Sequence, residues 1–385
     1  MKYPIGIQTF EEVIDGGYSY VDKTALVYKL THYAKNLFLS RPRRFGKSLL
    51  VSTLQAYFEG RKDLFKGLAI EKMEQEWEVY PVIHIDMSRG KYYQLKNLHA
   101  ILNGILSNYE DLYHVETLSE NSDVYSERLA NIIAAACRQT GKQVVVLIDE
   151  YDAPMHDSMN DEKLQNQIRN VLRDFFSPLK QQDANLRFVF ITGISKFSQL
   201  SIFSELNNLK ILTMKNEYAT VCGFTEEEIL KKFTEDIEAF AEENEMTYDE
   251  AVAALRNHYD GYHFSEKSPG IYNPFSIINA LDDKELNSYW FSSGTPTFLV
   301  ELLQKKGLDM LQLDDLWASD KRFDVPTEKI SDPIPVLYQS GYLTIKEYDK
   351  QSRQYRLGFT NAEVRQGFST SLFRYYSPDG MGKYD

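Results

Sequence analysis

One short segment of the chain carries the residue types that bind nucleotide phosphates. Residues 41–48 read Arg-Pro-Arg-Arg-Phe-Gly-Lys-Ser. Gly46 would let the backbone approach phosphate oxygens, Lys47 would place a point charge on the β- and γ-phosphates, and Ser48 would bind Mg²⁺. The usual phosphate-loop pattern begins with glycine, where this chain has Arg41,. The segment predicts ATP and Mg²⁺ as ligands, and the alternative is an arginine-rich surface turn.

Neighbouring residues of this segment are expected to share in nucleotide binding. Backbone N–H groups at the start of a helix bind phosphate oxygens, with help from the helix dipole. Arg41, Arg43 and Arg44 could add charge around the phosphates, reach a partner, or be solvated surface arginines. The predicted nucleotide-binding residues of the segment are Arg43, Arg44, Phe45, Gly46, Lys47, Ser48 and Leu49.

A pair of acidic residues follows a buried apolar run. Residues 143–149 read Gln-Val-Val-Val-Leu-Ile-Asp, and Glu150 comes next. A phosphate loop needs a carboxylate at the end of a neighbouring strand to hold Mg²⁺, so we expect Asp149 to share the metal with Ser48. Glu150 is placed to act as the general base that activates water. A capped loop is the alternative, and Asp152 is better suited to pinning the following loop.

A further strand ends in a polar residue. Residues 187–192 form a buried run that ends at Thr192, which we expect to lie between the two motifs,. Thr192 would then sense the γ-phosphate or orient the water, with Ser195 and Lys196 as alternatives. A polar strand end without such a role is equally compatible. The predicted catalytic residues are Lys47, Glu150 and Thr192.

Alternating strands and helices must position these residues. The pattern predicts strands at 36–40, 81–87, 143–149 and 187–192, and helices at 48–59, 126–140 and 164–176,. Such alternation indicates an α/β fold, a P-loop core with a largely parallel sheet. We assign residues 1–220 to this core.

The remainder of the chain no longer alternates between strands and helices. Capping boxes at Thr225/Glu228 and Thr247/Glu250 predict helices, so residues 221–322 are expected to form a helical lid,. A helix at 332–340, a hairpin of 342–348 with 354–359, and a helix capped by Thr360 and Glu363 predict a winged-helix-like region at 323–385.

Composition narrows the classes of partner. The net charge of −13 argues against a broad nucleic-acid-binding face,. Thin support for a local one comes from four arginines: Arg353, Arg356, Arg365 and Arg374. With no apolar run that could cross a bilayer, no signal peptide and only two cysteines among 385 residues, we expect a cytoplasmic protein away from membranes,. Oligomeric state is not predicted.

Several blocks of sequence resemble the AAA-ATPase-like proteins. These blocks are YVDKT, RPRRFGKS, LIDEYDAP, ITGISKFS, YDGYHF, YNPFS and YWFSSGTPTFL. Arginine in place of the first loop glycine belongs to that family's pattern. Members often carry a PD-(D/E)XK nuclease-like domain after the ATPase, but we find no matching carboxylate cluster and expect that domain to be absent here.

The resemblance implies further site residues. Gly46, Lys47 and Ser48 correspond to the phosphate loop, and Asp149 and Glu150 to the metal-binding and catalytic acids. Tyr20, Asp22 and Lys23 lie where related ATPases place part of the base pocket. The Gly294-Thr295-Pro296 segment resembles the element by which the lid of STAND-type ATPases approaches adenine, which makes Pro296 a predicted contact. A proline that starts a helix after a glycine turn is the alternative.

These observations leave three functions open. The first is an ATPase that acts as a conformational switch for a protein partner or effector domain. A second is a nucleotide-gated interaction module that does not hydrolyse ATP. The third is a nucleic-acid-associated regulator.

Overall fold

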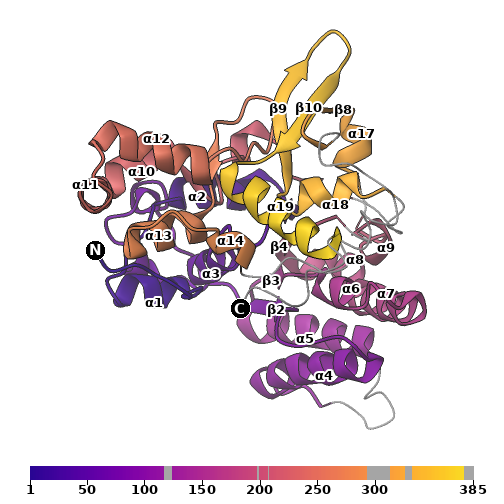
Figure 1. Ribbon diagram of the computed structural model, residues 1–385. Coiled ribbons are helices and arrows are strands. Elements are labelled where there is room, and N and C mark those ends of the chain that lie inside the picture. Colours follow the sequence, from indigo (N-terminus) through magenta and orange to yellow (C-terminus); the bar gives the residue numbers. More distant parts are fainter. Residues whose placement is uncertain (117–123, 197–198, 207, 293–312, 326–331, 377–385) are drawn as a thin grey trace.

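The fold is described from a computed structural model (Figure 1). It describes residues 1–116, 124–196, 199–206, 208–292, 313–325 and 332–376. The Gly294-Thr295-Pro296 segment lies outside the described residues.

A five-stranded parallel sheet forms the centre of the chain. Its order is β2 (Val82–Asp86), β3 (Val144–Asp149), β4 (Leu186–Gly193), β1 (Asn36–Ser40) and β5 (Lys210–Ile211). The predicted parallel sheet is therefore confirmed, and it is compatible with a P-loop-like core. Because the strands are parallel, β1, β4 and β3 end side by side at one edge, where ligands bind in such sheets.

Helices cover both faces of this sheet, which explains its continuous apolar strands. Leu37 and Leu39 of β1 pack in one cluster with Leu54 of α3 (Lys47–Phe58). Phe38 faces the opposite way, into a cluster with α4 (Leu95–Leu112), α5 (Tyr125–Thr140) and α7 (Glu162–Phe176). The shorter elements around the sheet are α1 (Phe10–Asp15), α2 (Thr24–Tyr33), η1 (Lys62–Phe65), η2 (Ala69–Lys72), α6 (Ala153–Asp157), α8 (Pro178–Gln181), η4 (Asp183–Asn185), α9 (Gln199–Ile202) and η5 (Asn216–Tyr218).

A group of helices follows the sheet along the chain and packs around its own apolar cluster. It comprises β6 (Phe224–Thr225), α10 (Glu226–Lys232), α11 (Thr234–Glu243), α12 (Tyr248–Tyr259), β7 (Ile271–Tyr272), α13 (Pro274–Asp283) and α14 (Tyr289–Ser292). Both predicted capping boxes are present at the starts of α10 and α12. The name lid remains a prediction for this group.

The described residues from 313 onward, here called the C-terminal region, contain a second sheet. Its elements are β8 (Leu316–Ala318), α17 (Asp320–Phe323), α18 (Ile334–Gln339), β9 (Leu343–Asp349), β10 (Gln354–Phe359) and α19 (Ala362–Tyr376). The predicted hairpin is confirmed as the antiparallel pair of β9 and β10. Strand β8 also pairs with β10, so this sheet includes residues before position 323.

The predicted cap of α19 is wrong in its residues. Asn361, not Thr360, caps this helix, because its Oδ1 accepts the Val364 N–H at 3.0 Å. The Glu363 carboxylate turns inward instead and accepts the backbone N–H of Trp290 at 2.6 Å. A tertiary contact has therefore replaced the local one.

Candidate functional site

The segment between β1 and α3 forms an open loop at a helix start. Gly46 has φ +85°, a left-handed conformation that favours glycine,. A Cβ built on Gly46 would meet no heavy atom within 4 Å, so no packed side chain fills the space beside it. Gly46 has no side chain to cap the first N–H groups of α3, a helix of 12 residues,. Those N–H groups can therefore serve an anion.

Lys47, Ser48 and Asp149 meet beside this loop. Lys47 is 4% exposed, and its Nζ donates to the Pro42 carbonyl at 3.1 Å. The Ser48 hydroxyl lies close enough to the Asp149 carboxylate to lower the pKa of that carboxyl. Burial, with help from Glu150, raises the pKa of Asp149 to about 6, while Ser48 and Lys47 oppose the rise. Asp149 Oδ1 is buried and has no hydrogen-bond partner among the described residues.

Strand β4 places a hydroxyl between the two motifs. Thr192 pairs in register with Leu39 of β1, and its carbonyl accepts the Tyr151 N–H at 3.1 Å. Its Oγ1 is buried and lacks a hydrogen-bond partner in the described part of the chain. Glu150, half-buried at the end of β3, has φ +50°, an uncommon conformation for a residue with a side chain,. Buried polar atoms without a partner, such as Thr192 Oγ1 and Asp149 Oδ1, need a ligand or water to satisfy them,.

Lys47, Ser48 and Glu150 line a cavity of about 440 Å³, whereas Asp149 and Thr192 are buried behind its lining. That volume lies within the usual range for small-molecule sites, roughly 300–1,000 Å³. One side is lined by residues 43–50, and another by Glu150, Ala153, His156 and Ile194. The opposite wall comes from residues 4–8 and 19–21, and from Cys222, Gly223, Phe224, Pro274, Phe275, Ile278 and Asn279. Three separate parts of the chain therefore enclose one cavity.

Arg41, the residue in place of the first loop glycine, faces away from the cavity. It is 1% exposed, and its guanidinium donates to the carbonyls of Thr213 and Tyr218 at 3.0 and 3.1 Å. The same group stacks 4.0 Å from the centre of the Phe264 ring. The idea that Arg41 adds charge around phosphates is therefore wrong, since the side chain fastens the end of β1 to the following segments.

Phe45 lines the cavity wall, but its ring is buried in the core. Only 1% of the residue is exposed, and the ring packs edge-on against Tyr262 and Phe264, with centroids 4.7 and 5.4 Å apart. A contribution of Phe45 to phosphate binding would therefore come from its backbone. Leu49, one turn into α3, also lies on the wall.

Arg43 and Arg44 remain exposed on the cavity wall. The Arg43 carbonyl accepts hydrogen bonds from Asn273 Nδ2 at 3.4 Å and Trp290 Nε1 at 3.2 Å. The Arg44 guanidinium lies 4.7 Å from the centre of the Phe275 ring. The loop is thus attached to the helical group through its backbone, while both guanidinium groups stay accessible.

Of the residues predicted for the base pocket, Tyr20 lines the cavity and Asp22 does not. Tyr20 lies on the cavity wall, where burial raises the pKa of its hydroxyl. Asp22 does not line the cavity: its two carboxylate oxygens accept the N–H groups of Thr24 and Ala69 at 2.8 and 2.7 Å. It therefore ties the start of α2 to η2. Pro296 lies outside the described residues.

Sequence reasoning missed several wall residues. Residues 4–8 belong to no motif, and Ser88, Gly90 and Lys91 after β2 gave no signal. His156 had one available signal, its spacing of four residues from Asp152 in a short helix,. No group of three or more His, Cys, Asp or Glu side chains suited to a metal occurs within the described ranges. Nor does any helix there have the length and apolarity needed to cross a membrane.

The fold and the loop define an α/β protein with a P-loop-like core. A family model described as "AAA-ATPase_like: Predicted AAA-ATPase" matches residues 4–203. The chain is also similar to an "Uncharacterized protein in vnfD 5'region" of Azotobacter chroococcum mcd 1, with 34% identity over 388 residues. That match covers 98% of this chain and 71% of the relative. The chain belongs to the predicted AAA-ATPase family, which suggests nucleotide binding and an ATPase-like function.

Proposed function

We propose that this chain binds Mg·ATP in the 440 Å³ cavity and hydrolyses it, as a conformational switch for a partner or effector domain. The observation that carries the proposal is the closeness of Lys47 and Ser48, at the start of α3, to Asp149, which ends a strand two positions from β1 in the sheet. Family membership supports the same assignment.

The residues at the phosphate end take distinct roles in this proposal. The N–H groups of Gly46 and the start of α3 bind phosphate oxygens, and Lys47 leaves the Pro42 carbonyl to neutralise the β- and γ-phosphates,. Glu150 accepts the proton of the attacking water. Thr192 Oγ1, buried without a described partner, orients that water or the γ-phosphate,.

The residues also fit a magnesium ion. Ser48 and Asp149 supply two oxygen ligands, and Mg²⁺ usually completes its shell with phosphate and water oxygens. The unused Asp149 Oδ1 and the raised pKa of this carboxyl are what a cation would relieve,. Bound there, Mg²⁺ would neutralise charge on the β- and γ-phosphates.

The helical group is proposed as the lid that closes over the base. Phe224, Phe275 and Ile278 are the apolar side chains that this group contributes to the cavity wall. We keep the proposed divisions 1–220, 221–322 and 323–385, with β8 joining the winged-helix-like part because it pairs with β10. The adenine contact of Pro296 stays part of this proposal.

Two substitutions test the proposal. Lys47→Ala should abolish the rise in melting temperature that Mg·ATP produces, because the loop loses the buried ammonium group proposed to neutralise the β- and γ-phosphates,. Glu150→Gln should keep that rise but release phosphate at least about 100-fold more slowly, the usual effect of losing a general base. Thermal melts with and without nucleotide, and a phosphate-release assay, measure both effects.

Lys142→Ala is the matched control, since this exposed lysine pairs with Glu78 and does not line the cavity. An unchanged melting shift in Lys47→Ala would defeat nucleotide binding at this site. If wild type and Glu150→Gln both bind ATP and neither releases phosphate, the non-hydrolysing module replaces the ATPase.

A further inference from the structure

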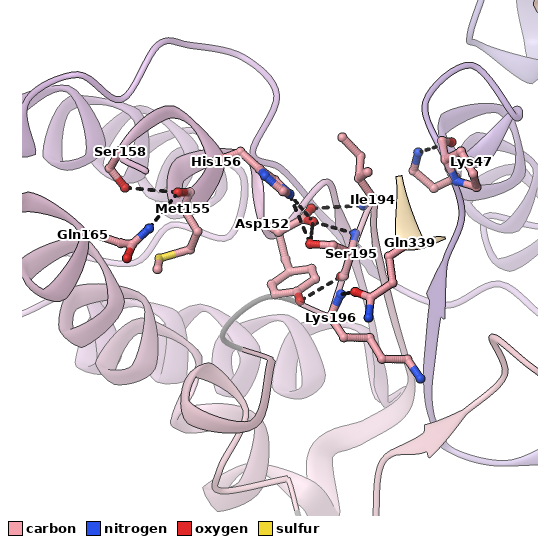
Figure 2. Close-up of polar contacts among 12 residues, drawn as sticks. Lys47, Asp152, Met155, His156, Ser158, Gln165, Ile194, Ser195, Lys196 and Gln339 are labelled. Atoms are coloured by element: carbon pink, nitrogen blue, oxygen red, sulfur yellow. Dashed lines mark hydrogen bonds and ion pairs between the residues drawn. The ribbon is translucent and has the colours of Figure 1, made fainter. Parts of the chain in front are cut away.

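The chain leaving β4 is held from two sides (Figure 2). On one side, Asp152 is fully buried and accepts hydrogen bonds from the Ile194 N–H at 3.1 Å and from the N–H and Oγ of Ser195, both at 2.8 Å. Asp152 lies two residues after Glu150, and Ile194 lies two residues after Thr192. This carboxylate therefore joins the two segments that carry the proposed catalytic groups.

His156 extends this contact to the cavity. Its Nε2 lies 2.9 Å from Asp152 Oδ2 and 3.1 Å from Ser195 Oγ, and both His156 and Ile194 line the cavity. Burial alone would raise the pKa of Asp152, but the His156 charge and the Ser195 hydrogen bonds lower it overall. An ionised carboxylate that holds this many donors fixes their relative positions.

On the other side, the C-terminal region holds the next residue. The Lys196 N–H donates to Gln339 Oε1 at 2.8 Å, and its Nζ pairs with Asp324 at 2.6 Å. Both side chains of the ion pair are nearly buried, with 5% and 11% exposed. The Gln339 amide in turn donates to the carbonyls of Phe323 and Val325 at 3.2 and 3.0 Å. The contact therefore reaches the backbone of the C-terminal region.

We propose that Asp152, Lys196 and Gln339 are positioning residues that make the C-terminal region part of the support of the nucleotide site. The proposal rests on the proposed function. Ser195 and Lys196 are consecutive, about 3.8 Å apart at Cα, so one cannot shift without moving the other. A nucleotide that displaces the end of β4 must therefore strain or repack the contacts to Gln339 and Asp324. Buried polar networks of this kind change between discrete arrangements.

Hydrogen exchange tests this link on the whole chain. The double variant Lys196→Met/Asp324→Asn removes the ion pair without leaving one buried charge unpaired. The control Lys180→Met/Glu205→Gln makes the same charge change at a surface pair, with about half of each side chain exposed. Exchange of each protein is measured with and without a non-hydrolysable ATP analogue and Mg²⁺, in peptides from α3 and from α18 and β9.

In wild type and control, nucleotide should slow exchange in both sets of peptides. In the double variant, the α3 response should remain and the α18 and β9 response should be lost. Where turnover is measurable, kcat should fall about tenfold with KM within twofold, because positioning and not binding is impaired. Gln339→Glu, which keeps the acceptor for the Lys196 N–H, should retain more of the response than Gln339→Leu.

Two results overturn the proposal. One is a wild type that responds at α3 but not at α18 and β9. The other is a double variant whose C-terminal response equals that of the control. A wild type with no response at α3 would instead remove the proposed function, and this inference with it.

Discussion

Burial raises the pKa of two carboxyl groups with different surroundings. Asp149, at about 6, ends β3 with Ser48 and Lys47 beside it. Glu363, at about 7, is fully buried among Ser276, Trp290 and the backbone of α14. A cation can stabilise the charge of the first, whereas the second is enclosed by the contact between α13, α14 and α19.

Glu363 should make the folded chain less stable as pH rises. Its folded pKa, about 7, exceeds the ordinary 4.5, so the folded state holds the proton more tightly. Stability from this group is present below pH 4.5 and is lost as pH rises to about 7, a change of about 3 kcal/mol,. Glu363→Gln should therefore be more stable than wild type at pH 8, and the difference should vanish near pH 4.

Urea unfolding of both proteins across this pH range measures the effect. Asp149 titrates over part of the same window, but it is present in both proteins and cancels in the comparison. A difference that stays constant with pH would show that the Glu363 proton is not involved.

At the scale of single residues, sequence patterns located the loop and the acidic pair but did not predict which partners each side chain contacts. Residue type predicted Lys47, Ser48 and Asp149 as neighbours, because a strand–loop–helix order leaves few other arrangements. The contacts of Arg41 and Asp22 could not be predicted, because the partners that take up their side chains lie 172 and 47 residues away along the chain. Long-range contacts of this kind leave no local pattern.

At the scale of elements, strands and helices were more predictable than their order. Continuous apolar runs predicted β1, β3 and β4 nearly to the residue, since strands buried on both faces require them,. Two Thr-x-x-Glu boxes formed, while the one at Thr360 did not, because Glu363 found the buried N–H of Trp290. The insertion of β4 between β1 and β3 follows from packing, which no single segment records.

Arg41 should stabilise the folded chain, because it attaches the end of β1 to the segment that contains Thr213 and Tyr218. Arg41→Gly would restore the usual phosphate-loop glycine and yet leave the carbonyls of Ser40, Thr213 and Tyr218 without this donor. The Tyr218 carbonyl keeps the Val221 N–H at 3.3 Å, so it is not orphaned. A buried acceptor left without a donor costs about 1–3 kcal/mol, so we expect a loss of about that size in unfolding free energy.

Chemical denaturation measures this loss. Arg43→Gly serves as the control, because the Arg43 side chain is exposed and only its carbonyl is bonded. Equal stability of the two glycine variants would contradict the role given to Arg41.

Across the whole molecule, charge distribution does not favour nucleic acid. Two of the arginines proposed for such a surface are paired with carboxylates: Arg356 lies 3.1 Å from Glu347, and Arg365 lies 2.6 Å from Asp314. The net charge of −13 and these two ion pairs both weaken the case for phosphate contacts,. The Arg374 side chain lies outside the described contacts.

The hydrogen bond from the Trp290 indole to the Arg43 carbonyl gives the loop a built-in optical reporter. Indole emission depends on the polarity and hydrogen bonding around the ring, and the chain has only three tryptophans. Loop rearrangement around a phosphate would alter this bond and hence the intrinsic fluorescence. Titration of unlabelled protein with nucleotide should therefore change emission, and Trp290→Phe should lose that change while Trp317→Phe keeps it.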